Sequence, residues 1–306
     1  MSRIGVLVMA YGGPDQLDDV EPYLQDVRGG RPTSPAMIAE MRERYREIGG
    51  KSPIRERTLA QAQALQAALD HFDRNFAVYA GMRHWTPYIK DVLAEIAGAG
   101  IDRAVGLVMA PHYSRMSIGA YYRKVDEAGP PLMLQRIEQW YLLPGYLDAL
   151  TDHIRAALDR FPDNSGQDIP IVFSAHSLPE RILTWNDPYR DQLMATAAAL
   201  VERLKPAVHR FAFQSAAMTP DPWLGPDISQ VVGKLAAEGH HEILVAPIGF
   251  VCEHVEILYD IDIVLQRQAR TLGVHLERIE MLNTAPAMIN GLAGLIRAEA
   301  GKAGWL

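Results

Sequence analysis

The sequence predicts an α/β fold of two similar, doubly wound lobes, each with a parallel sheet flanked by helices, and with a ligand cleft between the lobes. Two observations predict this class. Short apolar runs that suit buried strands alternate with longer helical patterns, as a parallel sheet with helices on both faces requires. The alternation also restarts near residues 138–146, which divides the chain into comparable halves.

The first half should contain four strands and the helices that connect them. The apolar runs that predict strands are Ile4–Ala10, Phe76–Gly81, Ala104–Met109 and Met133–Ile137. Helical spacing predicts helices over Leu17–Val27, Pro35–Ile48, Ile54–Phe72, Tyr88–Ala97 and Ile118–Glu127. Pro35 suits a first helical turn, because that position needs no backbone N–H donor.

The second half repeats the pattern. Strands are expected over Ile169–Phe173, Phe211–Phe213 and Ile243–Ile248. Helices are expected over Tyr146–Arg160, Tyr189–Leu204, Ile228–Glu238, Val255–Ala269 and Ala287–Ala300. We place the boundary between an N-terminal lobe, residues 1–143, and a C-terminal lobe, residues 144–306, and the last helix could pack back on the first lobe.

Composition excludes several classes of protein. The net charge of −7 argues against nucleic acid as the main partner, because binding phosphates needs a basic surface. No apolar run approaches the roughly 20 residues that span a bilayer, and no charged-then-apolar leader follows Met1. We therefore expect a cytoplasmic monomer without stable membrane insertion. The single cysteine, Cys252, rules out an intrachain disulfide and a four-cysteine iron–sulfur cluster.

Familiar catalytic motifs are also missing. The chain has no G-x-S-x-G nucleophile elbow and no H-E-x-x-H zinc motif. Gly50, Lys51 and Ser52 imitate the end of a phosphate-binding loop, but Tyr45 stands where that loop needs its first glycine. The site chemistry must therefore come from other residues.

An imidazole and a carboxylate follow two predicted strands of the second half. His176 comes just after Ile169–Phe173, and Glu256 follows Ile243–Ile248. Open α/β sheets bind ligands at the carboxyl ends of their strands, so the two side chains could face one site. A neutral imidazole with an ordinary pKa near ~6.5 could accept a proton, and the carboxylate could stabilise a cation. Nearby aromatic residues and arginines suit a flat apolar molecule with peripheral acids.

Six motifs spread over nearly the whole chain carry a family resemblance. They are M-A-Y-G-G-P at Met9–Pro14, R-Y-R-E-I-G-G-K-S-P at Arg44–Pro53, A-P-H-Y-S at Ala110–Ser114, S-A-H-S-L-P-E at Ser174–Glu180, T-P-D-P-W-L-G-P at Thr219–Pro226 and G-F-V-C-E-H-V-E-I-L-Y-D at Gly249–Asp260. With them the chain resembles the ferrochelatases, which insert ferrous iron into a porphyrin to make haem. The resemblance implies two doubly wound lobes, a porphyrin in the cleft, and Fe2+ as a substrate rather than a cofactor.

The resemblance also implies roles for individual residues. His176 looks like the family's metal-binding and proton-accepting histidine, and Glu256 like the facing carboxylate. Positions that line the pocket or hold propionates are matched by Tyr11, Arg28, Arg44, Tyr45, Ser52 and Tyr121. We add Arg83 and Trp223 as expected substrate contacts, because both lie in predicted loops near the site.

Tyr11 bears on which porphyrin is used. Enzymes that act on protoporphyrin usually have an aliphatic residue or methionine there, whereas the coproporphyrin enzymes of Gram-positive bacteria often have tyrosine. We therefore expect coproporphyrin III to be converted to coproheme, with Tyr11 axial to the product iron and a coproheme decarboxylase or an iron donor as partner. The alternatives are a protoporphyrin IX ferrochelatase, a sirohydrochlorin cobaltochelatase and a non-catalytic tetrapyrrole carrier.

Structural readings of these residues stay open. His176 could be a satisfied structural histidine, and Glu256 could complement the dipole of the helix that it begins. His254, two residues before Glu256, could cap or support as well as bind metal. Asp260 shares the predicted helical face of Glu256, but Val264 stands where many relatives continue the acidic row. We therefore expect iron to reach Glu256 without a full row of acids.

Overall fold

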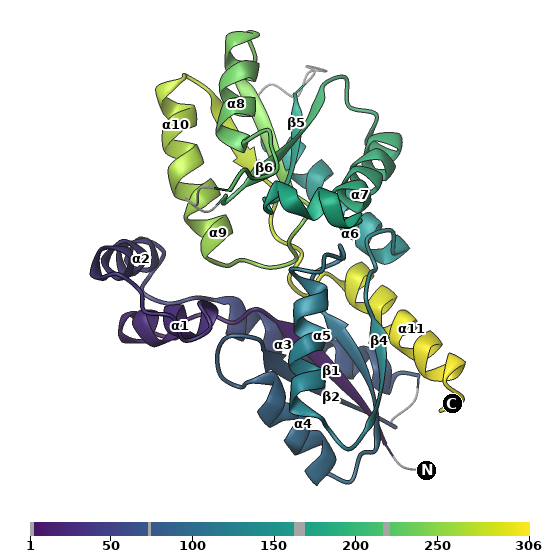
Figure 1. Ribbon diagram of the computed structural model, residues 1–306. Helices are drawn as coiled ribbons and strands as arrows, with labels where there is room; N and C mark the ends of the chain where they lie inside the picture. Colours follow the sequence, from purple (N-terminus) through teal and green to yellow (C-terminus); the bar gives the residue numbers. More distant parts are fainter. Residues whose placement is uncertain (1–2, 73–74, 162–168, 217–220) are drawn as a thin grey trace.

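Two four-stranded parallel sheets form the centre of the computed structural model, which describes residues 3–72, 75–161, 169–216 and 221–306 (Figure 1). The strand orders are β2-β1-β3-β4 and β6-β5-β7-β8, so the two lobes repeat one topology. Every strand pairing in both sheets is parallel. The predicted fold class is therefore confirmed.

The first lobe is built on β1, whose residues are all buried because the strand lies between β2 and β3. Its strands are β1 (Ile4–Ala10), β2 (Phe76–Met82), β3 (Arg103–Val108) and β4 (Met133–Ile137). Its helices are the 3-10 turn η1 (Leu17–Asp19), α1 (Val20–Val27), α2 (Pro35–Glu47), α3 (Ile54–Asp70), α4 (Ile89–Gly98) and α5 (Ile118–Ala128). The Ser34 hydroxyl caps α2 by accepting the N–H of Met37, and Pro35 occupies the first turn as predicted.

The second lobe repeats this arrangement around its central strand β5. Its strands are β5 (Ile171–His176), β6 (His209–Gln214), β7 (Glu242–Pro247) and β8 (His275–Arg278). Its helical segments are α6 (Pro144–Leu158), η2 (Glu180–Trp185), α7 (Tyr189–Leu204), α8 (Ile228–Ala237), α9 (Val255–Leu258), the π-helical η3 (Asp260–Leu265), α10 (Gln266–Thr271) and α11 (Pro286–Lys302). Because β5 pairs with both β6 and β7, its carboxyl end lies at the point where the order of connections reverses.

One apolar cluster runs through both lobes. Its members include Val6 of β1, Leu150 of α6, Phe173 of β5 and Leu292 of α11. Helix α11 packs against α6 and α3, and Figure 1 shows it alongside the first lobe. Gly145 lets α6 and α11 touch, because a Cβ there would lie 2.1 Å from the carbonyl oxygen of Ala287. The domain boundary between residues 143 and 144 stays a prediction.

Helices α1 and α2 reach from the first lobe toward the second. Figure 1 shows them at the side of the molecule, close to α9. Their apolar side chains form a small cluster against which Val255 of α9 packs, and its buried members are Val20, Tyr23, Leu24, Ile38 and Tyr45. The first lobe therefore contacts the second just where β7 delivers Glu256.

Several element predictions differ from the structure. The single helix predicted over Val255–Ala269 is instead divided into α9, η3 and α10. Strand β8 and the 3-10 helix η2 were not predicted. Thr219 and Pro220, which belong to one of the six sequence motifs, lie outside the described residues. The segments that differ from the prediction come after β5 or after β7 in the chain, where the structure is less regular.

Candidate active site

The structure brings His176 and Glu256 together. His176 is the last residue of β5, and Glu256 lies in the first turn of α9, just after the neighbouring strand β7. The His176 Nε2 atom is 3.3 Å from Glu256 Oε1, and the two side chains are 28% and 31% exposed. Both groups are thus shielded by protein yet open to an incoming molecule.

Two hydrogen bonds fix the His176 residue. Its ring Nδ1 donates to the Ser177 carbonyl, so Nε2 is the nitrogen that faces Glu256. The Tyr189 hydroxyl donates to the His176 carbonyl at 3.0 Å. Burial opposes charging of the ring, but the Glu256 carboxylate, the Ser177 carbonyl and Asp260 together outweigh burial and raise the pKa of His176 to about 9.

The raised pKa corrects one sequence-based prediction. A neutral His176 with an ordinary pKa was expected, but the structure favours an imidazolium paired with a carboxylate at neutral pH. Burial raises the pKa of Glu256, whereas His176 and His254 act more strongly and hold it below its ordinary value. The two groups therefore form an ion pair before any substrate arrives.

His254 supports Glu256. Its Nδ1 donates to the Cys252 carbonyl at 3.1 Å, and its Nε2 lies 3.2 Å from Glu256 Oε2. The residue occupies the position before α9, but its side chain does not cap that helix. Of the open readings for His254, the structure favours support of the carboxylate. The Gln214 side chain holds the backbone of the same residue, because its amide donates to the Glu256 carbonyl at 2.9 Å.

A second acid, Asp260, begins the π-helical segment. The Ser215 hydroxyl donates to its carboxylate, and Arg44 Nη1 lies 3.9 Å away. Burial raises the pKa of Asp260, the negative charge of Glu256 adds to this, and Ser215, Arg44 and His176 oppose it. The next position of the predicted row is Val264, an exposed apolar residue, so the row ends at Asp260.

Tyr11 and Arg83 form the neighbouring part of the site in the first lobe. The Arg83 guanidinium lies 5.7 Å from the ring centre of Tyr11 and 5.4 Å from that of Tyr121. Burial raises the pKa of Tyr11 to about 12; Arg83 opposes this, and the charges of Glu256 and Asp26 reinforce it. Tyr11 thus feels the Glu256 charge across the junction of the lobes and keeps its proton at neutral pH.

The remaining predicted residues divide into buried and accessible ones. Tyr45, Ser52 and Tyr121 are 1%, 5% and 5% exposed, so any effect of theirs on a ligand passes through the residues packed over them. Arg28 is half-buried, and its Nη1 lies 4.0 Å from the sulfur atom of Met37. The Trp223 ring lies 6.3 Å from the His176 ring, centre to centre, at an angle of 54°.

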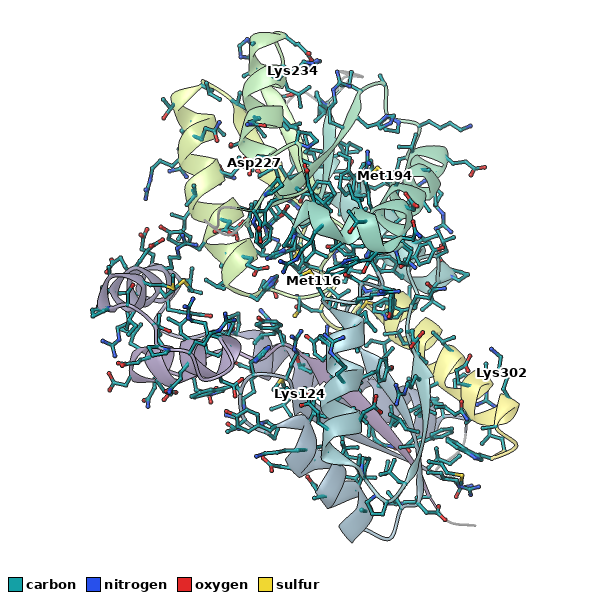
Figure 2. All side chains as sticks on the ribbon, in the orientation of Figure 1. Met116, Lys124, Met194, Asp227, Lys234 and Lys302 are labelled. Carbon is teal, nitrogen blue, oxygen red and sulfur yellow. The ribbon has the colours of Figure 1, made fainter. Side chains whose placement is uncertain are left out.

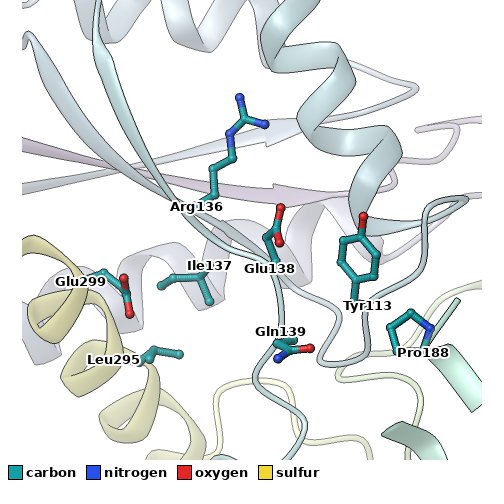
Figure 3. A pocket seen from close by; sticks show the side chains of 8 residues that line it. All are labelled: Tyr113, Arg136, Ile137, Glu138, Gln139, Pro188, Leu295 and Glu299. Carbon is teal, nitrogen blue, oxygen red and sulfur yellow. The ribbon is translucent and has the colours of Figure 1, made fainter. Parts of the chain in front are cut away.

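Side chains from both lobes fill the junction where Met116 lies (Figure 2). A separate pocket of about 430 Å³ opens between the end of β4, the start of α7 and α11 (Figure 3). Its wall includes Tyr113, Glu138 and Glu299 and contains neither His176 nor Glu256. This pocket is therefore distinct from the candidate active site.

Metal-site and membrane criteria give two further findings. Within the described ranges, no group of three or more His, Cys, Asp or Glu side chains is arranged to hold a metal ion. Over the same ranges, no helix has the length and apolar character that crossing a bilayer demands.

Sequence reasoning missed the residues that support this pair. Gln214 could be named from the sequence as a strand-end residue of the same group as His176 and Glu256, but its hydrogen bond to the Glu256 carbonyl could not, and Tyr189 was predicted only as the start of a helix. Asp187 was not singled out, although it is buried and hydrogen-bonded to both lobes. The motif S-A-H-S-L-P-E marks His176, whereas its supports are distant in sequence and carry no comparable signal.

Comparison with known proteins shows the family of the chain. The ferrochelatase family model matches residues 3–300. The chain is 42% identical to a ferrochelatase of Herpetosiphon aurantiacus, over 97% of this chain and 99% of that one. It is 37% identical to a coproporphyrin III ferrochelatase of Oceanobacillus iheyensis, over 97% of each chain.

Among solved structures, the fold is similar to SirB from Bacillus subtilis with Fe3+. The TM-score is 0.61 at 10% identity, with 99% of this chain and 97% of that chain covered. At that identity the likeness shows the fold alone. The family match and the sequence identities over nearly full length show that the chain belongs to the ferrochelatase family, whose activity is the insertion of a metal ion into a porphyrin.

Proposed function

We propose that the protein inserts Fe2+ into coproporphyrin III to give coproheme, and that His176 and Glu256 carry the reaction. The observation that supports the roles most strongly is the contact of 3.3 Å between His176 Nε2 and Glu256 Oε1, at the carboxyl ends of two adjacent strands. Tyr11 lies on the opposite lobe within the electrostatic reach of the same carboxylate. A flat macrocycle between the lobes would thus have Tyr11 on one face and His176 on the other.

The resting ion pair gives a reason for the order of events. In the free protein, Glu256 stabilises the proton on His176. A divalent cation that binds the Glu256 carboxylate replaces a negative neighbour by a positive one, which lowers the pKa of His176 and releases its proton to water. The lone pair of Nε2 can then bind the metal together with Glu256, and it becomes free to accept a pyrrole proton when the metal moves from the protein to the macrocycle. Arrival of the metal thereby activates the base.

The metal must also leave the protein for the porphyrin. Imidazole and carboxylate suit a divalent iron ion, and a ligand set this small binds it without closing around it. Insertion replaces two pyrrole protons by Fe2+, so two protons leave the macrocycle for each iron that enters. His176 accepts the first and hands it on before accepting the second, while Glu256, His254 and Asp260 form a polar path away from the ring.

Substrate choice depends on the arginines. Coproporphyrin III carries propionates where protoporphyrin IX carries vinyl groups. Among the described residues, the Arg83 guanidinium donates to the Met116 carbonyl at 3.4 Å and Arg28 Nη1 meets Met37 Sδ, and neither forms an ion pair with an acidic side chain, so both could take a carboxylate. Ion pairs that stay open to solvent contribute about 0–1 kcal/mol each, so we expect the arginines to act on orientation and selectivity more than on affinity. Relatives from Oceanobacillus and Geobacillus are described as coproporphyrin III ferrochelatases.

The test compares substrates and metals under anaerobic conditions. We expect kcat/KM for Fe2+ insertion to be at least ~10-fold higher with coproporphyrin III than with protoporphyrin IX, an energy of about 1.4 kcal/mol. Arg83→Gln should lower the ratio of the two kcat/KM values. The control is Arg297→Gln on α11, where the arginine lies over the Phe72 ring, and this change should leave the ratio as it is. A higher kcat/KM with protoporphyrin IX would contradict the assignment, as would a preference for Co2+ with sirohydrochlorin.

A further inference from the structure

Asp187 is a buried charged residue that the proposed chemistry does not use. Its side chain is 6% exposed, in the segment that joins η2 to α7. Within the described part of the chain, the hydrogen bonds that its carboxylate receives come from neutral donors. A buried carboxylate depends on such donors. An oxygen left without a hydrogen bond costs on the order of 1–3 kcal/mol, and more when the group is charged. The donors and Asp187 therefore hold one another in place.

The donors come from both lobes. Asp187 Oδ2 accepts from the Ser114 hydroxyl at 3.0 Å and from the Arg115 backbone N–H at 2.8 Å, both in the loop that follows β3 of the first lobe. Asp187 Oδ1 accepts from the backbone N–H of Tyr189 at 3.1 Å, at the start of α7 in the second lobe. One carboxylate thus ties the two lobes together at the junction.

On the second-lobe side, the tie leads to His176. The backbone of Tyr189 is held by Asp187, and the hydroxyl of Tyr189 donates to the His176 carbonyl at 3.0 Å. Tyr189 is itself buried, so its ring cannot swing away while its backbone is fixed. The end of β5, and with it the His176 ring, is positioned through this side chain.

On the first-lobe side, the tie leads to Arg83. The Ser114 hydroxyl that donates to Asp187 also accepts from the Met116 backbone N–H at 3.1 Å. The Met116 carbonyl accepts from Arg83 Nη1 at 3.4 Å, and the Arg83 guanidinium lies over the Tyr11 ring. Figure 2 shows Met116 at the junction of the lobes. The same carboxylate is therefore connected to both faces of the site.

We propose that Asp187 is a positioning residue for metal insertion: it sets the spacing between His176 of the second lobe and the Tyr11–Arg83 face of the first. The inference rests on the proposed roles of His176 and Tyr11. In this role Asp187 touches neither porphyrin nor metal, and it acts through Ser114 and Tyr189. Because reacting atoms displaced by about 1 Å can lose on the order of 100-fold in rate, a loosened junction should slow the chemical step more than it weakens porphyrin binding.

The test uses Asp187→Asn, which keeps the size of the side chain. An amide has one acceptor oxygen and one NH2 donor, so it cannot accept from Ser114 and Tyr189 at once. We expect kcat for Fe2+ insertion per folded molecule to fall roughly 10- to 100-fold while the porphyrin Kd changes by less than about 3-fold. The matched control is Asp191→Asn, the same change at an exposed position on α7, which should keep the wild-type kcat.

Two further readouts separate positioning from mere stability. Resonance Raman spectra of bound porphyrin should show weaker out-of-plane lines in Asp187→Asn, since these report how the two faces bend the macrocycle. Ser114→Ala, which keeps the carboxylate and its backbone donors, should lower kcat by a smaller factor, roughly 3- to 10-fold, and this variant serves if Asp187→Asn does not fold. In the double variant, the two losses should not multiply.

The outcomes are distinct. Wild-type kcat and an unchanged Raman spectrum in folded Asp187→Asn would overturn the inference, as would wild-type kcat in Ser114→Ala, or a loss of activity that only follows the unfolded fraction. If His176→Ala retains wild-type metallation, the proposed function of the pair fails, whatever Asp187 does. If His176→Ala is inactive and Asp187→Asn is normal, only the positioning role fails.

Discussion

The two lobes share a strand order but place their strand-end histidines in opposite electrostatic settings. His112 follows β3 of the first lobe, is 2% exposed and meets a neutral partner, the Thr196 hydroxyl, at 2.9 Å. Burial lowers the pKa of His112 to about 3. His176 ends β5 of the second lobe, where Glu256 overcomes the effect of burial and raises the pKa to about 9. The contrast teaches that an acid partner, rather than burial of the imidazole, decides which of the two histidines is charged at neutral pH.

Removing the two histidines should separate them most sharply. His176→Ala should lower kcat for Fe2+ insertion by at least ~10³-fold, because it removes the residue proposed as metal ligand and general base, while the porphyrin Kd changes by less than about 3-fold. Anaerobic absorbance changes measure kcat, and quenching of protein fluorescence measures Kd. His112→Asn is the control and should keep kcat within about 3-fold in the folded protein, at some cost in stability. Equal losses in both variants would erase the distinction.

Removing the acid should make His176 resemble His112. In Glu256→Gln the imidazole loses its anionic neighbour, so burial should bring the pKa of His176 from about 9 to below its ordinary value. Turnover should fall roughly 10²- to 10³-fold, because the metal also loses a ligand. NMR titration of the His176 ring protons checks the shift. A pKa that stays near its wild-type value would show that Glu256 is not its cause.

The two histidines should also give opposite pH dependences of stability. The folded-state pKa of His176 lies above that of the unfolded chain, so its contribution is complete below pH ~6.5 and is lost as the pH rises through about 9. The folded-state pKa of His112 lies below the unfolded value, so its stabilising effect is lost as the pH falls from ~6.5 toward about 3. A plot of the free energy of unfolding against pH should therefore have an acid limb from His112 and an alkaline limb from His176. On each limb the free energy of unfolding should change by about 1.4 kcal/mol per pH unit at most.

Urea unfolding at several pH values measures these limbs. His112→Asn should flatten the acid limb and His176→Gln the alkaline one, each without altering the other. If either variant flattened both limbs, or neither, the opposite settings of the two residues would be wrong.

The smallest expected effect concerns the end of the acidic row. Val264 is exposed and lies in η3, the π-helical segment that follows the helix of Glu256. Val264→Glu should change turnover at limiting iron by less than ~2-fold, because an exposed carboxylate attracts a cation only weakly in water. Initial rates at low Fe2+ are the measurement. A large gain would mean that iron needs an acidic row that this chain lacks.

The sequence predicted the repeated lobes because apolar strand runs and helical spacing are local signals. It did not predict β8, a strand of four residues at the edge of its sheet, in which Leu276 is the one buried residue and no long apolar run is present. It also predicted one regular helix after Val255, where the structure has a π-helical segment between α9 and α10. Neither feature has a strong local pattern, so tertiary packing decides both.

The site shows the same division. His176 and Glu256 could be found from the sequence, because each follows a strand run within a distinctive motif. The protonation of His176 could not, since it depends on a distance of 3.3 Å between residues 80 positions apart. Asp187 and Tyr189 escaped detection for a related reason: their importance comes from hydrogen bonds that cross between elements.

The central claim is that the His176–Glu256 pair receives the metal before the porphyrin does, and anomalous X-ray diffraction from anaerobic crystals soaked with Fe2+ tests it most directly. We predict one anomalous peak about 2.0–2.3 Å from both His176 Nε2 and Glu256, distances that are usual for nitrogen and oxygen ligands of such ions. A peak held elsewhere, with the ion pair intact beside it, would contradict the claim.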